Sequence, residues 1–128
     1  MDYTQRMNGF AAKCGLPPPE TATGAVVIDF NGIAVSFLDN ASGGAILLHA
    51  EIGEALGGSA GIVAREMLKA NAALRNMPGA VLCQDPETKA FAAIRAIPFQ
   101  AAEPDVLVET VGELVKTVAS WRERLGRH

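Results

Sequence analysis

The sequence predicts one α+β domain over residues 1–128, in which a twisted antiparallel sheet is flanked by helices in the order α-β-β-β-α-β-β-α. Asn31-Gly32 separates two apolar runs, which is typical of a β-hairpin because both residues of its tight turn need a positive φ. Three other segments repeat apolar residues at helical spacing. Strands joined by hairpins and flanked by helices favour an α+β fold over a parallel α/β fold. A length of 128 residues suits one domain.

Residues 2–14 predict the first helix, which Gly15 and the prolines after Leu16 bring to an end. Glycine suits the left-handed cap position, and proline cannot continue a helix. The apolar stripe of this helix is Tyr3, Met7, Phe10 and Cys14.

Residues 25–50 predict a three-stranded antiparallel meander. Its second turn is "DNASGG", residues 39–44, and its third strand lies near residues 45–50. Residues 80–97 predict a second hairpin with the turn "DPETK".

Two more helices are predicted, one from Ser59 to about Asn76 and one from about Pro104 to Leu125. The stripe of the first is Val63, Met67, Ala70 and Leu74. The stripe of the second is Leu107, Val111, Leu114, Val118, Trp121 and Leu125.

The charge balance argues against a nucleic-acid-binding protein, which needs a basic face to displace counterions from phosphates. Here the net charge is −3 and charged residues make up 20% of the chain. The two cysteines, together with the lack of an apolar leader and of a membrane-length apolar run, lead us to expect free thiols in a reducing cytoplasm.

The stretch "GGSAG", residues 57–61, has the letters of the G-x-S-x-G nucleophile elbow of serine hydrolases. That elbow needs a strand running directly into the serine, with an acid and then a histidine further along the chain. Here "EIGEALGG" separates the third strand from Ser59, His49 precedes the serine, and His128 is the last residue. The sequence favours Ser59 as a helix N-cap, whose oxygen accepts a bond from an early helix amide.

No other motif predicts catalysis, a metal or a cofactor. Cys14, His49, Cys83 and His128 lack the spacing of metal ligands, and no Walker loop or G-x-G-x-x-G is present. Asp29 is unusual inside an apolar strand, where it either has a structural partner or faces a groove.

Alternation divides the first three strands into two faces. One face is uniformly large and apolar and should form the core: Val26, Ile28, Phe30, Ile33, Val35, Phe37, Ile46 and Leu48. The other face is small and mixed: Ala25, Val27, Asp29, Ala34, Ser36, Leu38, Ala45, Leu47 and His49. Three helices offer little to cover this second face, so it either meets another chain or is an ordinary exposed sheet face. The edge strands could also take up an extended peptide by strand addition.

The whole pattern resembles the class I type III secretion chaperones, also called the Tir-chaperone family. The resemblance covers nearly the whole chain and depends on element order and short matches. These are "CGL" after the first helix, "GAVVIDFNGIAVSFL", "LLHAEIG", "MLKANAAL", "DPETKAF", and the last helix with Val115, Ala119 and Trp121. Where the family commonly has a proline after the third strand, this chain has "LGGSAG".

The resemblance implies a cytoplasmic bacterial homodimer that is not an enzyme and uses no cofactor. Such chaperones bind the N-terminal segment of a secreted effector, hold it extended around the dimer and keep it soluble and fit for export. Apolar patches on the first helix and the sheet receive effector side chains, which leads us to expect partner contacts at Met7, Phe10, Val27, Leu38 and Leu47.

We expect the homodimer to form around the second helix, through Val63, Met67, Ala70 and Leu74. The first and last helices already supply long stripes for the core, so this third stripe should meet its own copy. Two other interpretations stay open from the sequence. One is a regulatory domain of the same fold that sequesters a transcription factor or other regulator, and the other is a hydrolase that uses Ser59 or a small-ligand domain.

Overall fold

The structure, a computed structural model, describes residues 2–55, 58–73 and 80–127 and has the predicted element order. The helices are α1 (Tyr3–Lys13), α2 (Ala60–Ala73) and α3 (Pro104–Arg127). The strands are β1 (Ala25–Phe30), β2 (Ile33–Asn40), β3 (Ala45–Gly53), β4 (Ala80–Gln84) and β5 (Phe91–Pro98), and short 3-10 turns occupy Ala41–Gly43 and Phe99–Ala101.

The five strands form one antiparallel sheet in the order β1-β2-β3-β5-β4. The predicted hairpin turn is confirmed, because Asn31 has φ 53° and Gly32 has φ 91°. The Asp29 side chain accepts the Gly32 N–H at 3.1 Å, so one of its oxygens supports this turn. The chain crosses from β3 to β4 through α2 and then returns, which places β5 between β3 and β4.

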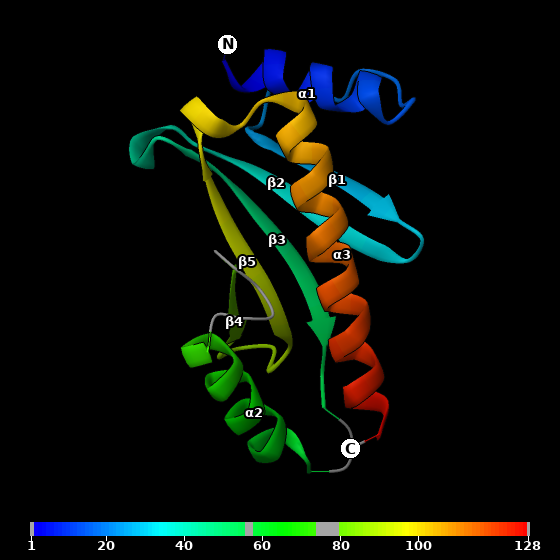
Figure 1. Ribbon diagram of the computed structural model, residues 1–128, viewed down its shortest axis with the longest axis vertical. Coiled ribbons are helices and arrows are strands. Elements are labelled where there is room, and N and C mark those ends of the chain that lie inside the picture. Colours follow the sequence, from blue (N-terminus) through cyan, green and yellow to red (C-terminus); the bar gives the residue numbers. More distant parts are fainter. Residues whose placement is uncertain (1, 56–57, 74–79, 128) are drawn as a thin grey trace.

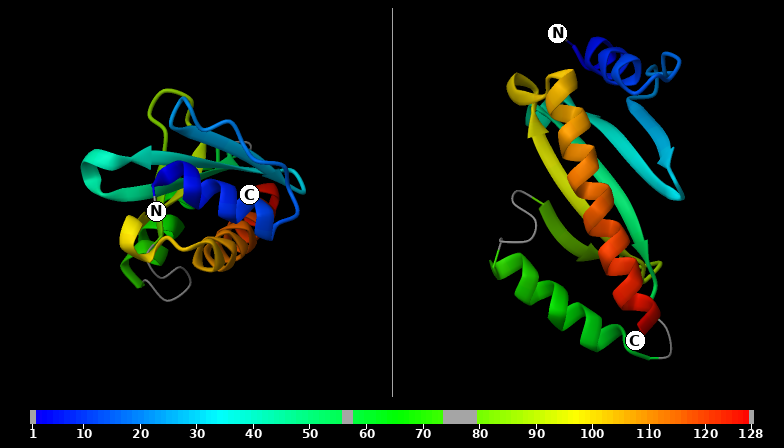
Figure 2. Two further views of the ribbon diagram at one scale, coloured as in Figure 1. Left: turned by 90° about the horizontal axis from the view of Figure 1, so that it is seen from above. Right: turned by 45° about the vertical axis from the view of Figure 1, so that its right-hand side comes forward.

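All three helices lie on the same side of the sheet (Figures 1 and 2). The long helix α3 runs across β3, while α1 crosses one end of the sheet and α2 packs beside β4. Among the described residues, no helix covers the opposite side (Figure 2). The fold therefore has one covered face and one open face.

The covered face holds the hydrophobic core, as alternation predicted. Val35, Phe37, Ile46 and Leu48 are fully buried there. The Phe37 ring meets the Phe10 ring of α1 with centroids 5.1 Å apart. The stripe of α3 packs into the same core: Leu107, Val111, Leu114, Val118, Trp121 and Leu125.

Tyr3 joins α1 to the sheet, since its hydroxyl donates to the Phe37 carbonyl oxygen at 2.6 Å. Burial, with a smaller contribution from the Asp39 carboxylate, raises the pKa of Tyr3 to about 12. The phenol therefore keeps its proton throughout the neutral pH range, so its hydroxyl continues to donate to Phe37.

Arg122 of α3 binds the sheet at the point where β2 and β3 separate. Its Nε donates to the Ile52 carbonyl at 3.1 Å, and its two terminal nitrogens donate to the carbonyls of Gly32 and Glu51, each at 2.9 Å. The β2–β3 ladder ends at the Val35–Ala50 pair, so these carbonyls lie at or beyond its end. One guanidinium thus joins the β1–β2 turn to the end of β3.

Asn71 of α2 binds the outer edge of the sheet. Its amide nitrogen donates to the Leu82 carbonyl at 2.9 Å, and its amide oxygen accepts the Leu82 N–H at 2.8 Å. Leu82 is the middle residue of β4, which is an edge strand. The side chain therefore satisfies the backbone groups that a neighbouring strand would otherwise bind.

Candidate functional site

The open face is the side of the sheet that no described helix covers (Figure 2), and three cross-strand rows define it. The apolar row is Ala25, Leu38, Leu47 and Ala96. The middle row is Val27, Ser36, His49, Ile94 and Val81. The acidic row has two parts, Asp29 beside Ala34 and Glu51 beside Ala92 and Cys83. Because side chains alternate along each strand, these residues all point away from the helices.

The structure brings together the three sheet residues that were predicted to contact a partner. Leu38 stands directly opposite Leu47, and Val27 lies on the neighbouring strand in the next row. Val27 is 63% exposed, while Leu38 and Leu47 are half-buried by their neighbours on the sheet. The open face thus presents a group of apolar side chains on a rigid support, which is the kind of surface that other chains bind.

The sequence interpretation missed the part of this face that β4 and β5 contribute. Ile94 stands between His49 and Val81, and Val81 is 54% exposed. The signal was present, because "AVLCQ" and "FAAIRAI" alternate in the same way as the first three strands. What the sequence could not supply was the strand order, which places β5 next to β3.

Met7 and Phe10 lie in the core and not on a surface. Both are fully buried, and Phe10 packs against Phe30 as well as Phe37. The expectation that they contact a partner is corrected accordingly, since neither side chain has exposed area to offer. The stripe of α1 was recognised, but it faces the sheet of its own chain.

The apolar stripe of α2 also faces its own chain. The expectation that the first and last helices leave no room for this stripe in the core is therefore corrected. Val63 is fully buried and Met67 is 3% exposed, while Ala70 packs partly buried against the same core. Leu74 lies outside the described residues. The exposed apolar residues of α2 are instead Ile62, 54% exposed, and Leu68, 69% exposed.

A small apolar cavity lies beside Leu68, between α2 and the edge strand β4. Its volume is about 150 Å³, and Met67, Leu68, Leu82, Cys83 and Phe91 are among its lining residues. The outer side of α2 therefore has an exposed apolar side chain, Leu68, next to an apolar cavity.

Ser59 stands where the sequence placed it, directly before α2. Its carbonyl accepts the N–H of Val63 at 3.1 Å, as the carbonyl of an N-cap residue does. Gly57, the first residue of the G-x-S-x-G match, lies outside the described residues. His49 belongs to the open face of β3, and Ser59 follows the strand by several residues.

Within residues 2–55, 58–73 and 80–127, no three His, Cys, Asp or Glu side chains come together as a metal site would require. The thiols of Cys14 and Cys83 are free, and burial raises the pKa of each. No described helix combines the length and the apolar character of a membrane span.

Solved structures with the same fold confirm the architecture. A chain of the HopA1–SchA chaperone–effector complex is 17% identical, with a TM-score of 0.81 over 94% of this chain and 93% of that chain. A chain of the ExsC–ExsE complex is 20% identical, with a TM-score of 0.82 over 98% of this chain and 97% of that chain. A chain of the ExoU–SpcU complex from the type III secretion system of Pseudomonas aeruginosa is 16% identical, with a TM-score of 0.72 over 91% and 95% of the two chains.

No curated protein sequence matches this chain. The sequence does match the model of the Tir chaperone protein (CesT) family over residues 5–122, which is nearly its whole length. This match confirms the resemblance that the short motifs and the element order had indicated, and the chain belongs to the Tir chaperone protein (CesT) family.

Proposed function

We propose that this protein is a type III secretion chaperone, one domain over residues 1–128, that binds the N-terminal segment of a secreted effector. It keeps that segment soluble, extended and fit for export from the bacterial cytoplasm. Family membership supports the chaperone function, and chaperone–effector complexes are among the structures that share the fold. The observation that carries the proposal is the open face, which spans five strands, exposes apolar side chains and has no described helix over it (Figure 2).

The partner segment binds the open face around Val27, Leu38 and Leu47. Covering a fully exposed apolar side chain with a partner contributes about 1.5–3 kcal/mol, and the half-buried Leu38 and Leu47 contribute less than this. Ordering a disordered segment has an entropic cost, so several such contacts are needed for stable binding. The protein acts by binding alone, without a cofactor and without catalysis.

Replacing Val27 and Leu38 by aspartate together is expected to abolish co-purification of the partner. Both side chains face away from the core, so the chain should fold as before. The measurement is affinity purification from the native cell followed by mass spectrometry, with circular dichroism to confirm the fold. Identifying the protein that is lost also separates a secreted effector from a regulator.

The matched control is Val106→Asp with Val108→Asp, which changes two exposed valines on α3 and leaves the open face intact. This control should retain the partner. Partner binding by a folded Val27→Asp, Leu38→Asp protein would remove the open face from the proposal.

We further propose a homodimer through the outer side of α2. The buried positions of Val63 and Met67 exclude them from direct contact, so the interface uses the exposed Ile62 and Leu68. Leu68 of one copy fills the cavity beside α2 of the other, and two-fold symmetry repeats the contact.

Leu68→Glu is expected to convert the dimer to a folded monomer, because the substitution acts twice in a symmetric interface. Sedimentation equilibrium should give the wild type about twice 13.4 kDa and the variant about 13.4 kDa. Met67→Glu is the informative comparison: it buries a charge inside one chain and should unfold the protein at any concentration. A wild type that sediments as a monomer would contradict the dimer.

A further inference from the structure

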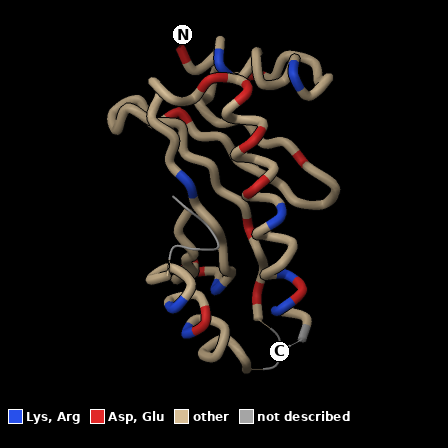
Figure 3. The backbone as a smooth tube through the Cα atoms, viewed as in Figure 1, with Lys and Arg blue, Asp and Glu red and all other residues tan. Residues whose placement is uncertain are grey.

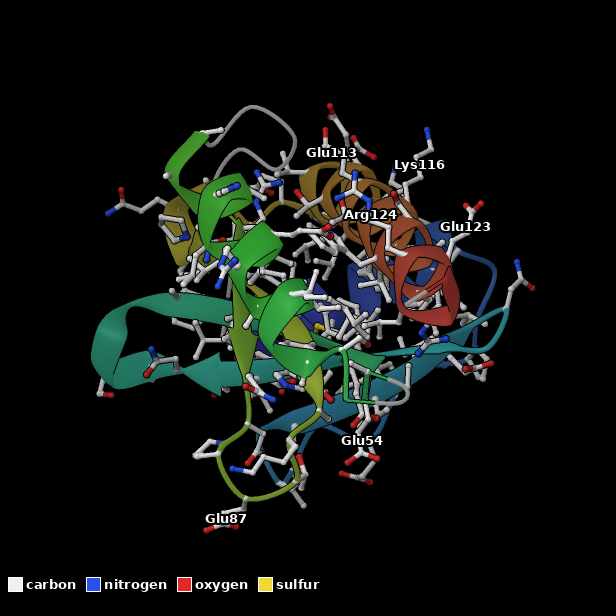
Figure 4. All side chains as sticks on the ribbon, turned by 90° about the horizontal axis from the view of Figure 1, so that it is seen from below. Glu54, Glu87, Glu113, Lys116, Glu123 and Arg124 are labelled. Atoms are coloured by element: carbon white, nitrogen blue, oxygen red, sulfur yellow. The ribbon has the colours of Figure 1, made fainter. Side chains whose placement is uncertain are left out.

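The charges around the open face gather at one end. Asp29 on β1 and Glu51 near the end of β3 both belong to the acidic row, and Glu54 follows β3 directly. Glu54 and Glu87 lie on the side of the sheet away from α2 and α3 (Figure 4). The strands otherwise carry few charged residues (Figure 3).

Among the described strand residues of the open face, no base balances these acids, and Arg122 of α3 donates to the backbone carbonyls of Gly32 and Glu51 and not to either carboxylate. Arg95, the one cation within the strands, stands opposite Leu48 on the covered face and pairs with Glu113 of α3 at 3.1 Å. Lys89 shares the β4–β5 turn with Asp85 and Glu87, so that turn remains net negative.

The opposite end of the open face is apolar and uncharged. The apolar row lies there, and the middle row separates it from the acidic row. Successive rows are two residues apart along each strand, which is roughly 6.6 Å. An extended segment that lies along the strands has the same repeat, so its alternate side chains meet the three rows in turn.

We infer that the segment bound on the open face carries two apolar residues at alternate positions and a lysine or arginine two residues beyond them. This inference rests on the proposed function and specifies the chemistry of the partner. The apolar side chains cover the rows around Leu38 and Val27, and the basic side chain reaches the carboxylates of Asp29 and Glu51. Asp29 uses one oxygen for Gly32 and retains its other oxygen for the partner.

A display library of random linear peptides selected on the full chain tests this pattern. The wild type should enrich peptides with the apolar-x-apolar-x-basic pattern, in either chain direction. Replacing the basic residue of a selected peptide by alanine should weaken binding roughly threefold to tenfold, the range for a few exposed ion pairs. This difference should shrink as salt concentration rises.

The variant Asp29→Asn with Glu51→Gln removes both charges and keeps an oxygen that can accept the Gly32 N–H. It should still select alternate apolar residues but lose the preference for a base. Asp29→Asn with Glu51→Lys should select an acid at the same position. Glu109→Gln on the exposed side of α3 is the control for net charge and should leave the preference unchanged.

The outcomes separate this inference from the proposed function. If selected peptides require Val27 and Leu38 but show no preference for a base, the charge pattern is wrong and the binding surface stands. If no selected peptide depends on Val27 and Leu38, both are overturned. If Val27→Asp with Leu38→Asp dissociates the homodimer, a second copy occupies the open face and the inference is likewise overturned.

Discussion

Phe10→Ala is expected to lower the free energy of unfolding by about 3–5 kcal/mol, the usual loss when a buried phenylalanine is truncated. Phe10 is fully buried, and its ring packs against Phe37 at 5.1 Å and Phe30 at 6.3 Å between centroids. Truncation leaves a cavity where α1 meets the sheet. Such a loss is a large fraction of the total stability of a small domain.

Urea unfolding at a fixed protein concentration measures this change. Trp121 is the single tryptophan and is buried in the core, so its fluorescence reports the transition. Leu16→Ala, at an exposed apolar residue just after α1, is the control and should change stability little. If Phe10→Ala leaves stability unchanged but abolishes partner binding, the prediction is wrong and Phe10 contacts the partner.

Arg122→Ala is expected to lower the free energy of unfolding by about 3 kcal/mol. The substitution removes three hydrogen bonds that a charged guanidinium donates, and each such bond is worth about 1.5–3 kcal/mol when buried. Because Arg122 is half-buried, water can bind the freed carbonyls and compensate part of the lost stability. The substitution also frees the β1–β2 turn from the end of β3. Hydrogen exchange should therefore increase around residues 31–35 and 50–53 in addition to the global loss.

Arg122→Lys tests whether geometry or charge matters at this site. An ammonium group lacks the planar fork that reaches three carbonyls, so lysine should recover only a minor part of the stability. Arg124→Ala is the matched control on the same helix. Arg124 stacks over the Trp121 ring at 4.4 Å, a contact worth about 0.5–1 kcal/mol at an exposed site. Equal losses at Arg122 and Arg124 would contradict the bridging role.

The sequence predicted the elements of this fold because local patterns encode them. The period of two in residues 25–50, the positive-φ turn at Asn31-Gly32 and the stripes of the helices are all visible without tertiary information. Alternation also separated the core face of the sheet from the open face correctly. Local patterns therefore predicted both the architecture and the sheet part of the candidate binding surface.

The errors concern where an amphipathic helix buries its stripe. Met7 and Phe10 were assigned to a partner, and Val63 and Met67 to a second copy, yet all four are buried within one chain. An apolar stripe indicates that one side of a helix must be buried, but it does not indicate which surface buries it. The answer depends on sheet order, and the crossover that places β4 at the edge is not a local property.

Side chains that bind distant backbone were equally beyond the sequence. Arg122 contacts residues 70 to 90 positions away, and Asn71 contacts a strand eleven positions later. Each looks from the sequence like an ordinary polar residue near the end of a helix. Long-range pairing of this kind has no periodic signal, so only the assembled fold reveals it.

The amide of Asn71 makes the two edges of the sheet unequal, and this limits the stoichiometry of assembly. A strand added along β4 would have to displace this amide from Leu82, so strand addition is expected along β1 instead. The α2 surface proposed for the homodimer lies beside β4, at the opposite edge of the sheet, so strand addition along β1 leaves that surface free. A filament of paired strands needs both edges of the sheet, so the closed β4 edge works against growth beyond a single added strand.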